Sequence, residues 1–392
     1  MTTVYLDNNA TTRVAPEVVE AILPYLSEHY GNASSMHSFG ITAGEALKKA
    51  RCSVQSLLGA EFDHEVVFTS GGTEADNTAI LSSLQTQPNR DEIVTTAVEH
   101  PAVLALCKHL SDDRGLRVHL VPVDGLGRLD VDAYRAAVGP RTAIASVMWA
   151  NNETGTIFPV RELAAIAREA GALFHTDAVQ AVGRVAVDVR DAGVDMLSLS
   201  AHKIHGPKGV GALYVRKGAK FSPMVRGGRQ ERARRGGTEN TAGIVGLGKA
   251  AELAKSGLHD LETRVRSLRD RLERAILDRV DGARLAGDPD NRLPNTTNVT
   301  FDCLESEAIL THLNRAGIAA SSGSACASGS VEPSHVLRAM RLPHTAAHGA
   351  VRFSLSRYTN EADVDHVLGV LPGVLAKLRE QSPHPRSYRH AS

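Results

Sequence analysis

The polar residues of this sequence that could do chemistry follow short apolar segments. In SGGTEADN, Gly72 and Thr73 offer a close backbone approach and the amides of a helix N-terminus, which together can bind phosphate. Asp177, in HTDAVQ, is a carboxylate that needs a cation or several donors if it is buried. Lys203, in SLSAHKIHGPKG, brings an amine, and His100, in EHPAVL, brings a ring that exchanges protons near neutral pH.

A phosphate cradle, a carboxylate and a lysine at adjacent strand ends together indicate pyridoxal phosphate. Keeping a free lysine amine, of pKa near ~10.4, neutral at pH 7 costs about 4 to 5 kcal/mol, and condensation with the cofactor aldehyde removes that cost. A carboxylate beside the ring nitrogen keeps the ring protonated, so that it can accept an electron pair from a substrate carbon. We therefore expect Lys203 to hold the cofactor, Asp177 to face the ring nitrogen and His100 to stack on the ring.

The polar neighbours of the lysine are expected to have subsidiary roles. Ser200 and His202 flank the predicted strand end, and we expect them to contact the phosphate. Lys208 lies further along the turn and is expected in solvent or near the phosphate. His205 has no chemical task in this interpretation and is expected to pack.

The expected secondary structure places these residues at one edge of a sheet. Apolar strands are predicted at EVVFTS, EIVTTAV, TAIASVMWA, ALFHTDAV and VDMLSLSA. Helices are predicted from about Thr73, from Pro101 and over VRELAAIAREAG, which Gly171 should end. Because continuous apolar strands alternate with helices, we expect a mostly parallel sheet covered on both faces, with ligands beyond the carboxyl ends of its strands.

A second unit of mixed α and β structure is expected after this sheet. Apolar residues at helical spacing between Leu261 and Val280 predict a long charged helix from about Leu258. The strand NTTNVTF, a helix near 306–316, the strand VRFSLS and a last helix near 362–379 follow. The remaining tail is polar and is expected to fray.

The composition argues for a soluble protein. The 392 residues contain 44 Lys and Arg and 44 Asp and Glu, so no global charge favours a nucleic acid or a membrane surface. No run approaches the ~18 apolar residues of a membrane span, and the N-terminus lacks the pattern of a secretion signal. The 4 cysteines are far apart, which predicts free thiols. We expect a cytoplasmic protein with neither a nucleic acid nor a membrane as partner.

Two other interpretations use the same sequence differently. His175, Asp177 and His202 could form the two-histidine, one-carboxylate face of a non-haem iron oxygenase, which leaves Lys203 unexplained. The arginines and glycines of RGGRQERARRGG, residues 226–237, are typical of nucleic-acid-binding segments, but this segment has no aromatic residue for base stacking. A visible absorbance that borohydride bleaches would favour the lysine-bound cofactor over the iron site.

A series of motifs runs along nearly the whole chain. They are YLDNNATT, TSGGTEADN, EHPAVL, ANNETG, HTDAVQ, SLSAHKIHGPKG, RRGGTENTAGIVGLGKA, GSACASGSVEPSHVLRAM and VRFSLSRYT. In this order they closely resemble the cysteine desulfurases of the NifS/IscS type, in the class V aminotransferase group of fold type I pyridoxal-phosphate enzymes. The resemblance implies an α/β fold with a large domain, residues 14–258, on a mostly parallel seven-stranded sheet covered by helices. A smaller α+β domain would comprise residues 1–13 and 259–392.

The resemblance also implies a role for each site residue. Lys203 would be bonded to the cofactor, Asp177 would contact its ring nitrogen and His100 would stack above it. Arg352 would hold the substrate carboxylate by the planar two-point contact that arginine makes, with Asn152 beside it. Thr238 would reach the phosphate of the partner in a homodimer. Around the cofactor the resemblance places Gly72, Thr73, Asn152, Gln180, Ser200 and His202.

Cys326 is the candidate sulfur carrier. Seven serines and glycines lie between residues 321 and 330, a composition typical of a mobile loop that could carry sulfur from the cofactor to an acceptor. An unperturbed thiol is only a few per cent thiolate at pH 7, so we expect a base, for which His100 is the candidate. The implied reaction converts L-cysteine to L-alanine and leaves a persulfide on Cys326. The other cysteines are expected to be structural: Cys52, Cys107 and Cys303.

The destination of the sulfur stays open at this stage. The expected acceptor is an iron-sulfur scaffold protein, or another sulfur acceptor that serves thiolation. YLDNNATTR, HGPKG and GSVEPSHVLRAM lean by association towards the nitrogen-fixation type rather than general cluster supply. A selenocysteine lyase or a kynureninase-like enzyme would share the cofactor residues, and Cys326 favours desulfuration over both. No resident metal is expected, and transient ligation of an iron-sulfur cluster by Cys326 stays open.

Overall fold

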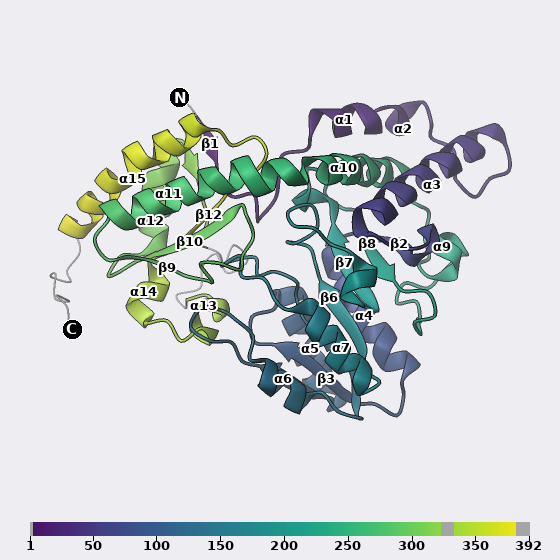
Figure 1. The fold of residues 1–392 in the computed structure, drawn as a ribbon. Helices are drawn as coiled ribbons and strands as arrows, with labels where there is room; N and C mark the ends of the chain where they lie inside the picture. The colour runs from purple at the N-terminus through teal and green to yellow at the C-terminus, as the bar shows by residue number, and fades with distance from the viewer. Residues whose placement is uncertain (1–2, 323–332, 382–392) are drawn as a thin grey trace.

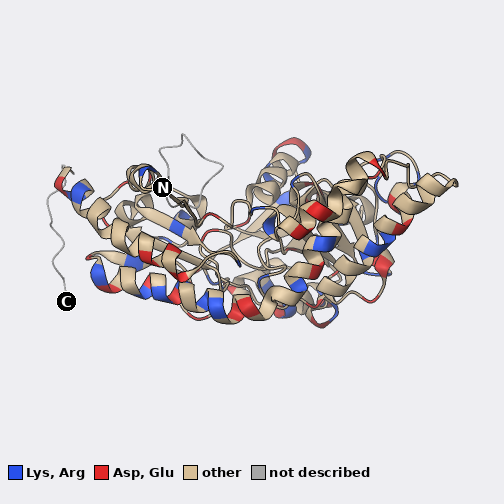
Figure 2. Ribbon diagram, turned by 90° about the horizontal axis from the view of Figure 1, so that it is seen from above, with Lys and Arg blue, Asp and Glu red and all other residues tan. Residues whose placement is uncertain are grey.

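The computed structural model describes residues 3–322 and 333–381 (Figure 1). A seven-stranded sheet lies on one side of the molecule and a smaller sheet packed against three long helices lies on the other. Within the described residues, no helix is long and apolar enough to cross a membrane. Basic and acidic residues are interspersed along the ribbon in Figure 2, in agreement with their equal numbers in the sequence.

The large sheet confirms the predicted mostly parallel arrangement. Its strands lie in the order β2-β8-β7-β6-β5-β3-β4, and β8 is antiparallel to both of its neighbours. All but β4 are buried along their length or nearly so, which is why they read as continuous apolar runs. The strands are β2 (Val66–Thr69), β3 (Glu92–Thr96), β4 (Arg117–Val121), β5 (Thr142–Ser146), β6 (Leu173–Asp177), β7 (Met196–Ser200) and β8 (Gly211–Val215).

Helices cover both faces of this sheet. Neighbouring residues of a strand point to opposite faces, so Val66 joins the apolar cluster on one face and Val67 the cluster on the other. The first cluster includes α3 (Ser38–Leu58), α7 (Val160–Glu169) and α10 (Thr241–Asp260). The second cluster includes α4 (Gly72–Thr86) and α5 (Pro101–Arg114). Shorter helices complete this part: α1 (Pro16–Ile22), α2 (Pro24–Ser27), α6 (Val131–Ala137), α8 (Val189–Ala192) and α9 (Gln230–Ala233).

A separate apolar cluster surrounds the small antiparallel sheet, whose strands lie in the order β12-β10-β9. The N-terminal strand β1 pairs in parallel with β11 nearby, and both contribute side chains to this cluster. The strands are β1 (Val4–Tyr5), β9 (Ala283–Leu285), β10 (Thr296–Phe301), β11 (Ile318–Ala319) and β12 (Ala350–Ser354). The helices of this cluster are α11 (Arg266–Arg279), α12 (Ser306–Arg315) and α15 (Glu361–Gln381). Buried apolar residues of α13 (His335–Ala339) and α14 (His344–His348) join the first cluster of the large sheet instead.

The expected start of the long helix near Leu258 is wrong. The helix begins at Thr241, where the Asn240 side chain accepts a hydrogen bond from the amide of Gly243. It then continues through a π-helical turn at Leu261–Val265 into α11. The domain limits at 13/14 and 258/259 stay a prediction, and the tail beyond residue 381 lies outside the described residues.

The arginine- and glycine-rich segment 226–237 bonds to its own chain. Arg235 forms an ion pair with Glu74 at 2.9 Å, and Arg234 donates to the carbonyl of His64. Glu231, from the same segment, accepts two hydrogen bonds from Arg51. Intramolecular contacts therefore account for much of the charge that suggested a nucleic-acid partner.

Two glycines of α10 give a matched test of its packing on α3. A Cβ at Gly248 would lie 2.5 Å from the Cα of Ala50, whereas a Cβ at Gly257 would meet nothing within 4 Å. We expect Gly248→Ala to lower the free energy of unfolding by about 1 to 3 kcal/mol, because the helices must separate. Gly257→Ala should raise it by up to about 1 kcal/mol through helix propensity. Urea denaturation measures both, and equal effects would contradict this packing.

Candidate active site

The predicted site residues of one chain gather at the carboxyl edge of the large sheet. Gly72 and Thr73 begin α4 after β2, and His100 precedes α5 after β3. Asp177 ends β6, and Lys203 lies in the short 3-10 turn after β7. The others follow the same strand ends: Asn152 after β5, Gln180 after β6, and Ser200 and His202 at and after the end of β7.

Lys203 is held in an environment that favours its neutral amine. Its Nζ donates to the carbonyls of Asn9, at 2.5 Å, and Ala10, at 2.8 Å. Burial lowers the pKa of Lys203 to about 7, and the charges of Arg184 and Arg352 act in the same direction. At neutral pH a large fraction of the amine is therefore uncharged and nucleophilic.

Asp177 is buried near two basic side chains, those of His100 and Lys203. Its side chain is buried, and Oδ1 accepts a hydrogen bond from the amide of Val179 at 2.9 Å. Burial raises the pKa of Asp177, while the charges of His100 and Lys203 oppose that rise. A protonated ring nitrogen beside this carboxylate would supply the counter-charge that burial demands.

His100 has a fixed orientation at the start of α5. Its Nδ1 accepts a hydrogen bond from the amide of Ala102 at 3.1 Å, so the neutral ring carries its proton on Nε2. Burial is the main cause that lowers the pKa of His100, with Asp177 acting against it and Lys203 with it. In this tautomer Nε2 already carries a proton, so the ring must give up that proton before Nε2 can act as a base.

A pocket of about 390 Å³ lies where the phosphate was expected. It is lined by the start of α4, by Ser200 and His202 after β7, and by the exposed Lys208. His202 Nδ1 lies 3.1 Å from Oγ1 of Thr11, which leaves its other ring nitrogen for a ligand. The amides of a helix start, a hydroxyl, an imidazole and an ammonium are a donor set that suits a phosphate dianion.

Together these groups fit pyridoxal phosphate. Lys203 offers the amine, Asp177 a buried carboxylate and the 390 Å³ pocket the anion donors. A Cβ at Gly72 would lie 2.8 Å from Cγ2 of Val179, so only glycine lets α4 begin this close to the Asp177 turn. The phosphate donors and the ring-nitrogen partner are thereby held side by side.

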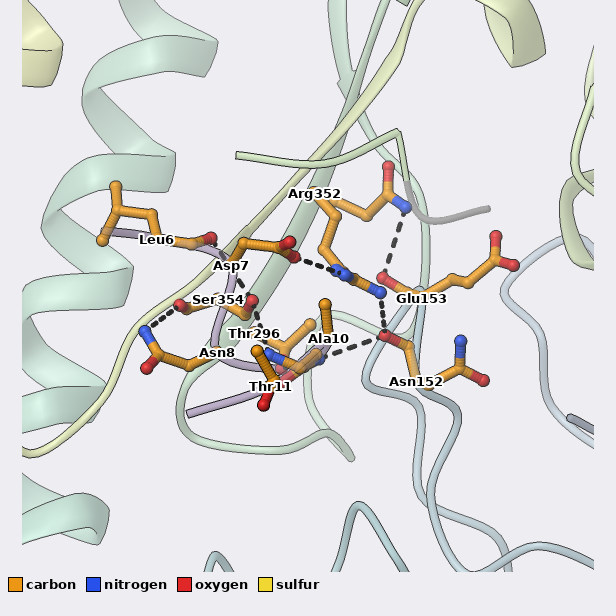
Figure 3. Close-up of polar contacts among 12 residues, drawn as sticks. Leu6, Asp7, Asn8, Ala10, Thr11, Asn152, Glu153, Thr296, Arg352 and Ser354 are labelled. Atoms are coloured by element: carbon orange, nitrogen blue, oxygen red, sulfur yellow. Dashed lines mark hydrogen bonds and ion pairs between the residues drawn. The ribbon is translucent and has the colours of Figure 1, made fainter. Parts of the chain in front are cut away.

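Arg352, from β12 of the smaller sheet, reaches the same edge (Figure 3). Its Nη1 donates to the carbonyl of Asn152 at 2.9 Å, and its Nη2 pairs with Oδ1 of Asp7 at 2.7 Å. The side chain is only 2% exposed. Gln180 donates to the carbonyl of Asn9 at 3.0 Å, so it contacts the segment that also holds Lys203.

Two predicted residues, Thr238 and His175, are not part of this cluster. Thr238 is exposed and does not line the pocket of its own chain. Cys326 lies outside the described residues. His175 is fully buried, with Ser146 and Ser198 at its two ring nitrogens, so it cannot serve the proposed iron site. Within the described residues, no group of three or more His, Cys, Asp or Glu side chains could hold a metal.

The other cysteines and His205 have less specific surroundings. Cys107 is buried, as expected of a structural cysteine, whereas Cys52 and Cys303 are exposed. That Cys52 and Cys303 are structural as well stays a prediction. His205 packs edge-on against Tyr358, as expected.

Several residues of the site were missed by the sequence reasoning. Arg184 is buried, donates to the carbonyl of Asn8 at 3.1 Å, and has its pKa lowered by burial to about 9. His335 Nε2 lies 2.9 Å from the carbonyl of Glu99, and Ser334 donates to Glu153 at 2.5 Å. Ser334 and His335 belong to the motif GSVEPSHVLRAM, whereas Arg184 lies in none of the motifs. A motif can point to such a residue, but it does not show which group the residue contacts.

Comparison with known proteins agrees with this geometry. A family model described as aminotransferase class-V matches residues 4–367. A cysteine desulfurase of Gluconacetobacter diazotrophicus is 66% identical over 98% of this chain and 96% of its own. The cysteine desulfurase NifS of Azotobacter vinelandii is 59% identical over 98% and 95%. The chain belongs to the cysteine desulfurases of the class V aminotransferase family.

Solved structures of the family have the same fold. A NifS-like protein superposes with a TM-score of 0.90 at 37% identity, over 96% of this chain and all of the other. A structure described as SspA in complex with cysteine gives a TM-score of 0.79 at 34% identity, over 91% of this chain. The fold type I architecture is therefore confirmed. Pyridoxal phosphate is the cofactor of this family, in agreement with the expectation from Lys203 and Asp177.

Loading of the apoprotein should follow the ionisation of Lys203. Only the neutral amine attacks an aldehyde, and the pKa of Lys203 is lowered to about 7. The rate of cofactor uptake should therefore rise with pH up to about 7 and level off above it. N-acetyl-lysine, as a control, should keep rising towards its pKa of about 10.4. Visible absorbance after mixing measures the rate, and a steep rise continuing above pH 9 would contradict the assignment.

Removing the charge of Asp177 should impair both cofactor binding and catalysis. We expect Asp177→Asn to bind pyridoxal phosphate more weakly and to lower kcat/KM for L-cysteine by about 100- to 10,000-fold. Asp195→Asn is a matched control, because Asp195 pairs with Arg216 at the opposite end of β7. That variant should lose stability and keep its cofactor affinity. Near-normal turnover by Asp177→Asn would contradict the role of this carboxylate.

Proposed function

We propose that this chain converts L-cysteine to L-alanine with pyridoxal phosphate and carries the removed sulfur as a persulfide on Cys326. The carrying observation is the convergence of Lys203, His100 and Asp177 at one sheet edge, with Arg352 reaching it from the smaller sheet. The high identity to cysteine desulfurases supports the same reaction. The role of Cys326 rests on the sequence, because that residue lies outside the described ones.

Each residue near the cofactor has a task that its contacts support. Arg352 would bind the substrate carboxylate, since a planar guanidinium matches it by two parallel hydrogen bonds. Lys203, with its pKa lowered to about 7, would take the α proton of the substrate and deliver it again at neutral pH. Asp177, at the end of β6, would supply the carboxylate that pairs with the ring nitrogen. Pyridoxal phosphate would supply the electron sink for the pair released at the substrate carbon.

Sulfur transfer can be written with conserved atoms and electrons. The Cys326 thiolate attacks the substrate sulfur, an S–S bond forms, and the C–S bond breaks with its electron pair left on the β carbon. That carbon takes a proton, so one thiol and one cysteine become one persulfide and one alanine. His100 carries a proton on Nε2 and would give this proton to the β carbon of the product. The same nitrogen could then take the proton of the Cys326 thiol in the next turnover.

The partner of the chain is proposed to be a second copy of itself. Large apolar side chains are exposed along the first three helices and the loop between them, an uncommon grouping for a monomer surface. Thr238 is exposed and could reach the phosphate of the partner. The exposed apolar residues are Leu23, Leu26, Tyr30, Met36, Phe39 and Ile41.

The persulfide is proposed to supply an iron-sulfur scaffold protein or another sulfur acceptor. The cytoplasmic location expected from the sequence stays a prediction. Mixing the protein with L-cysteine and candidate acceptors, and finding which one gains sulfur, identifies the destination.

Two substitutions separate the cofactor step from the sulfur step. Lys203→Ala should abolish both the visible absorbance of the bound cofactor and the turnover of L-cysteine. Cys326→Ala should keep the absorbance but form no persulfide, as measured by mass spectrometry after mixing with L-cysteine. Cys303→Ala, which removes an exposed thiol, is the matched control and should stay active. Normal sulfide and alanine production by Cys326→Ala would contradict its role as carrier.

A further inference from the structure

Asp7 lies directly against the arginine that is proposed to bind the substrate carboxylate (Figure 3). Its Oδ1 accepts a hydrogen bond from Nη2 of Arg352 at 2.7 Å, while Nη1 donates to the carbonyl of Asn152 at 2.9 Å. The Arg352 side chain is 2% exposed and that of Asp7 is 21% exposed. Two acceptors on separate segments therefore fix both terminal nitrogens of the guanidinium.

The backbone around Asp7 is held as firmly as its side chain. Asp7 forms a parallel bridge with Ser354, two residues beyond Arg352 on β12. The amide of Ser354 donates to the carbonyl of Leu6 at 2.7 Å, and the side chain of Asn8 donates to the carbonyl of Ser354 at 2.8 Å. Asp7 and Arg352 are thus neighbours in one hydrogen-bonded ribbon, and their distance does not depend on a flexible loop.

A buried arginine without a counter-charge is unfavourable, and its long side chain has several rotamers. Asp7 removes both problems, because it supplies the charge and selects one plane for the guanidinium. The carbonyl of Asn152 alone would supply no negative charge, and it would hold only one of the two terminal nitrogens of the guanidinium. A guanidinium held in one plane keeps its geometry ready for a second, planar carboxylate.

We propose that Asp7 is a positioning residue that orients Arg352 for the α-carboxylate of the substrate and thereby favours amino acids over simple amines. This inference rests on the proposed function, since it assigns the carboxylate contact to Arg352. The opposite role, in which Asp7 competes with the substrate for the guanidinium, predicts the opposite change in affinity. The two roles are therefore separable by measurement.

L-alanine and ethylamine provide the test, because they differ only by the carboxylate. Their dissociation constants for the cofactor-loaded protein can be read from the change in visible absorbance. For Asp7→Ala we expect the constant of L-alanine to rise about tenfold and that of ethylamine to stay within about twofold. Equal weakening of both ligands would indicate a merely structural role and overturn the proposal. Unchanged or tighter binding of L-alanine would overturn it as well.

Two further variants serve as a control and as a conservative substitution. Asp365→Ala removes a carboxylate from the exposed pair with Arg271 and should change neither constant. Asp7→Asn keeps the shape and one acceptor oxygen, and should weaken L-alanine selectively by a smaller factor. If Asp7→Ala is insoluble, Asp7→Asn decides by the same criterion.

Failure of this inference is distinct from failure of the proposed function. Wild-type protein that binds the cofactor but forms no alanine from L-cysteine would refute the proposed function. Wild-type protein that forms alanine, together with Asp7 variants that bind L-alanine and ethylamine in the wild-type ratio, would refute the inference alone.

Discussion

The balance of charge around Lys203 is the constraint on which the site depends. Burial lowers the pKa of this lysine, and the charges of Arg184 and Arg352 lower it further, while the carboxylates of Asp177 and Asp7 oppose the change. Three cationic groups in one desolvated region would repel one another without these two carboxylates. The result is an amine that is partly neutral near pH 7 beside the guanidinium of Arg352. A nucleophile and a carboxylate receptor can therefore coexist in one small site.

The segment of residues 7–10 contributes to this balance through Asp7 and joins the two halves of the molecule. Asp7 contacts Arg352 of the smaller sheet, and the carbonyls of Asn9 and Ala10 accept from Lys203 of the larger one. The side chain of Asn9 also donates to the carbonyl of Asn152 at 3.1 Å and to Oγ1 of Thr296 at 2.9 Å. These contacts lie within four residues, so one short segment contacts both the amine and the guanidinium.

The sequence was sufficient to predict the site residues that follow regular strands. It was not sufficient to predict those whose place depends on contacts between distant parts of the chain. Parallel strands bring their carboxyl ends to one edge, so a polar residue after each apolar run could be placed beside the others, as Asp177 and Lys203 were. Asp7 gave no such signal, because it follows a strand of 2 residues and its partner is 345 positions away. The start of α10 was misplaced for a local reason. Its cap is Asn240, and a π-helical turn carries the helix through the point where a change of pattern had indicated a beginning.

The buried carboxyl groups near the cofactor site differ in the charged groups that surround them. Glu99 and Asp76 are both buried; burial raises the pKa of Glu99 to about 8, and burial with the charge of Asp177 raises that of Asp76 well above its usual range. His175, 3.6 Å from Asp76, cannot compensate, because burial lowers its pKa to about 3 and it stays neutral. Asp177 differs in having His100 and Lys203 within reach of its charge. These neighbours oppose the effect of burial on the pKa of Asp177, which ends β6 at the edge where the ring nitrogen is expected.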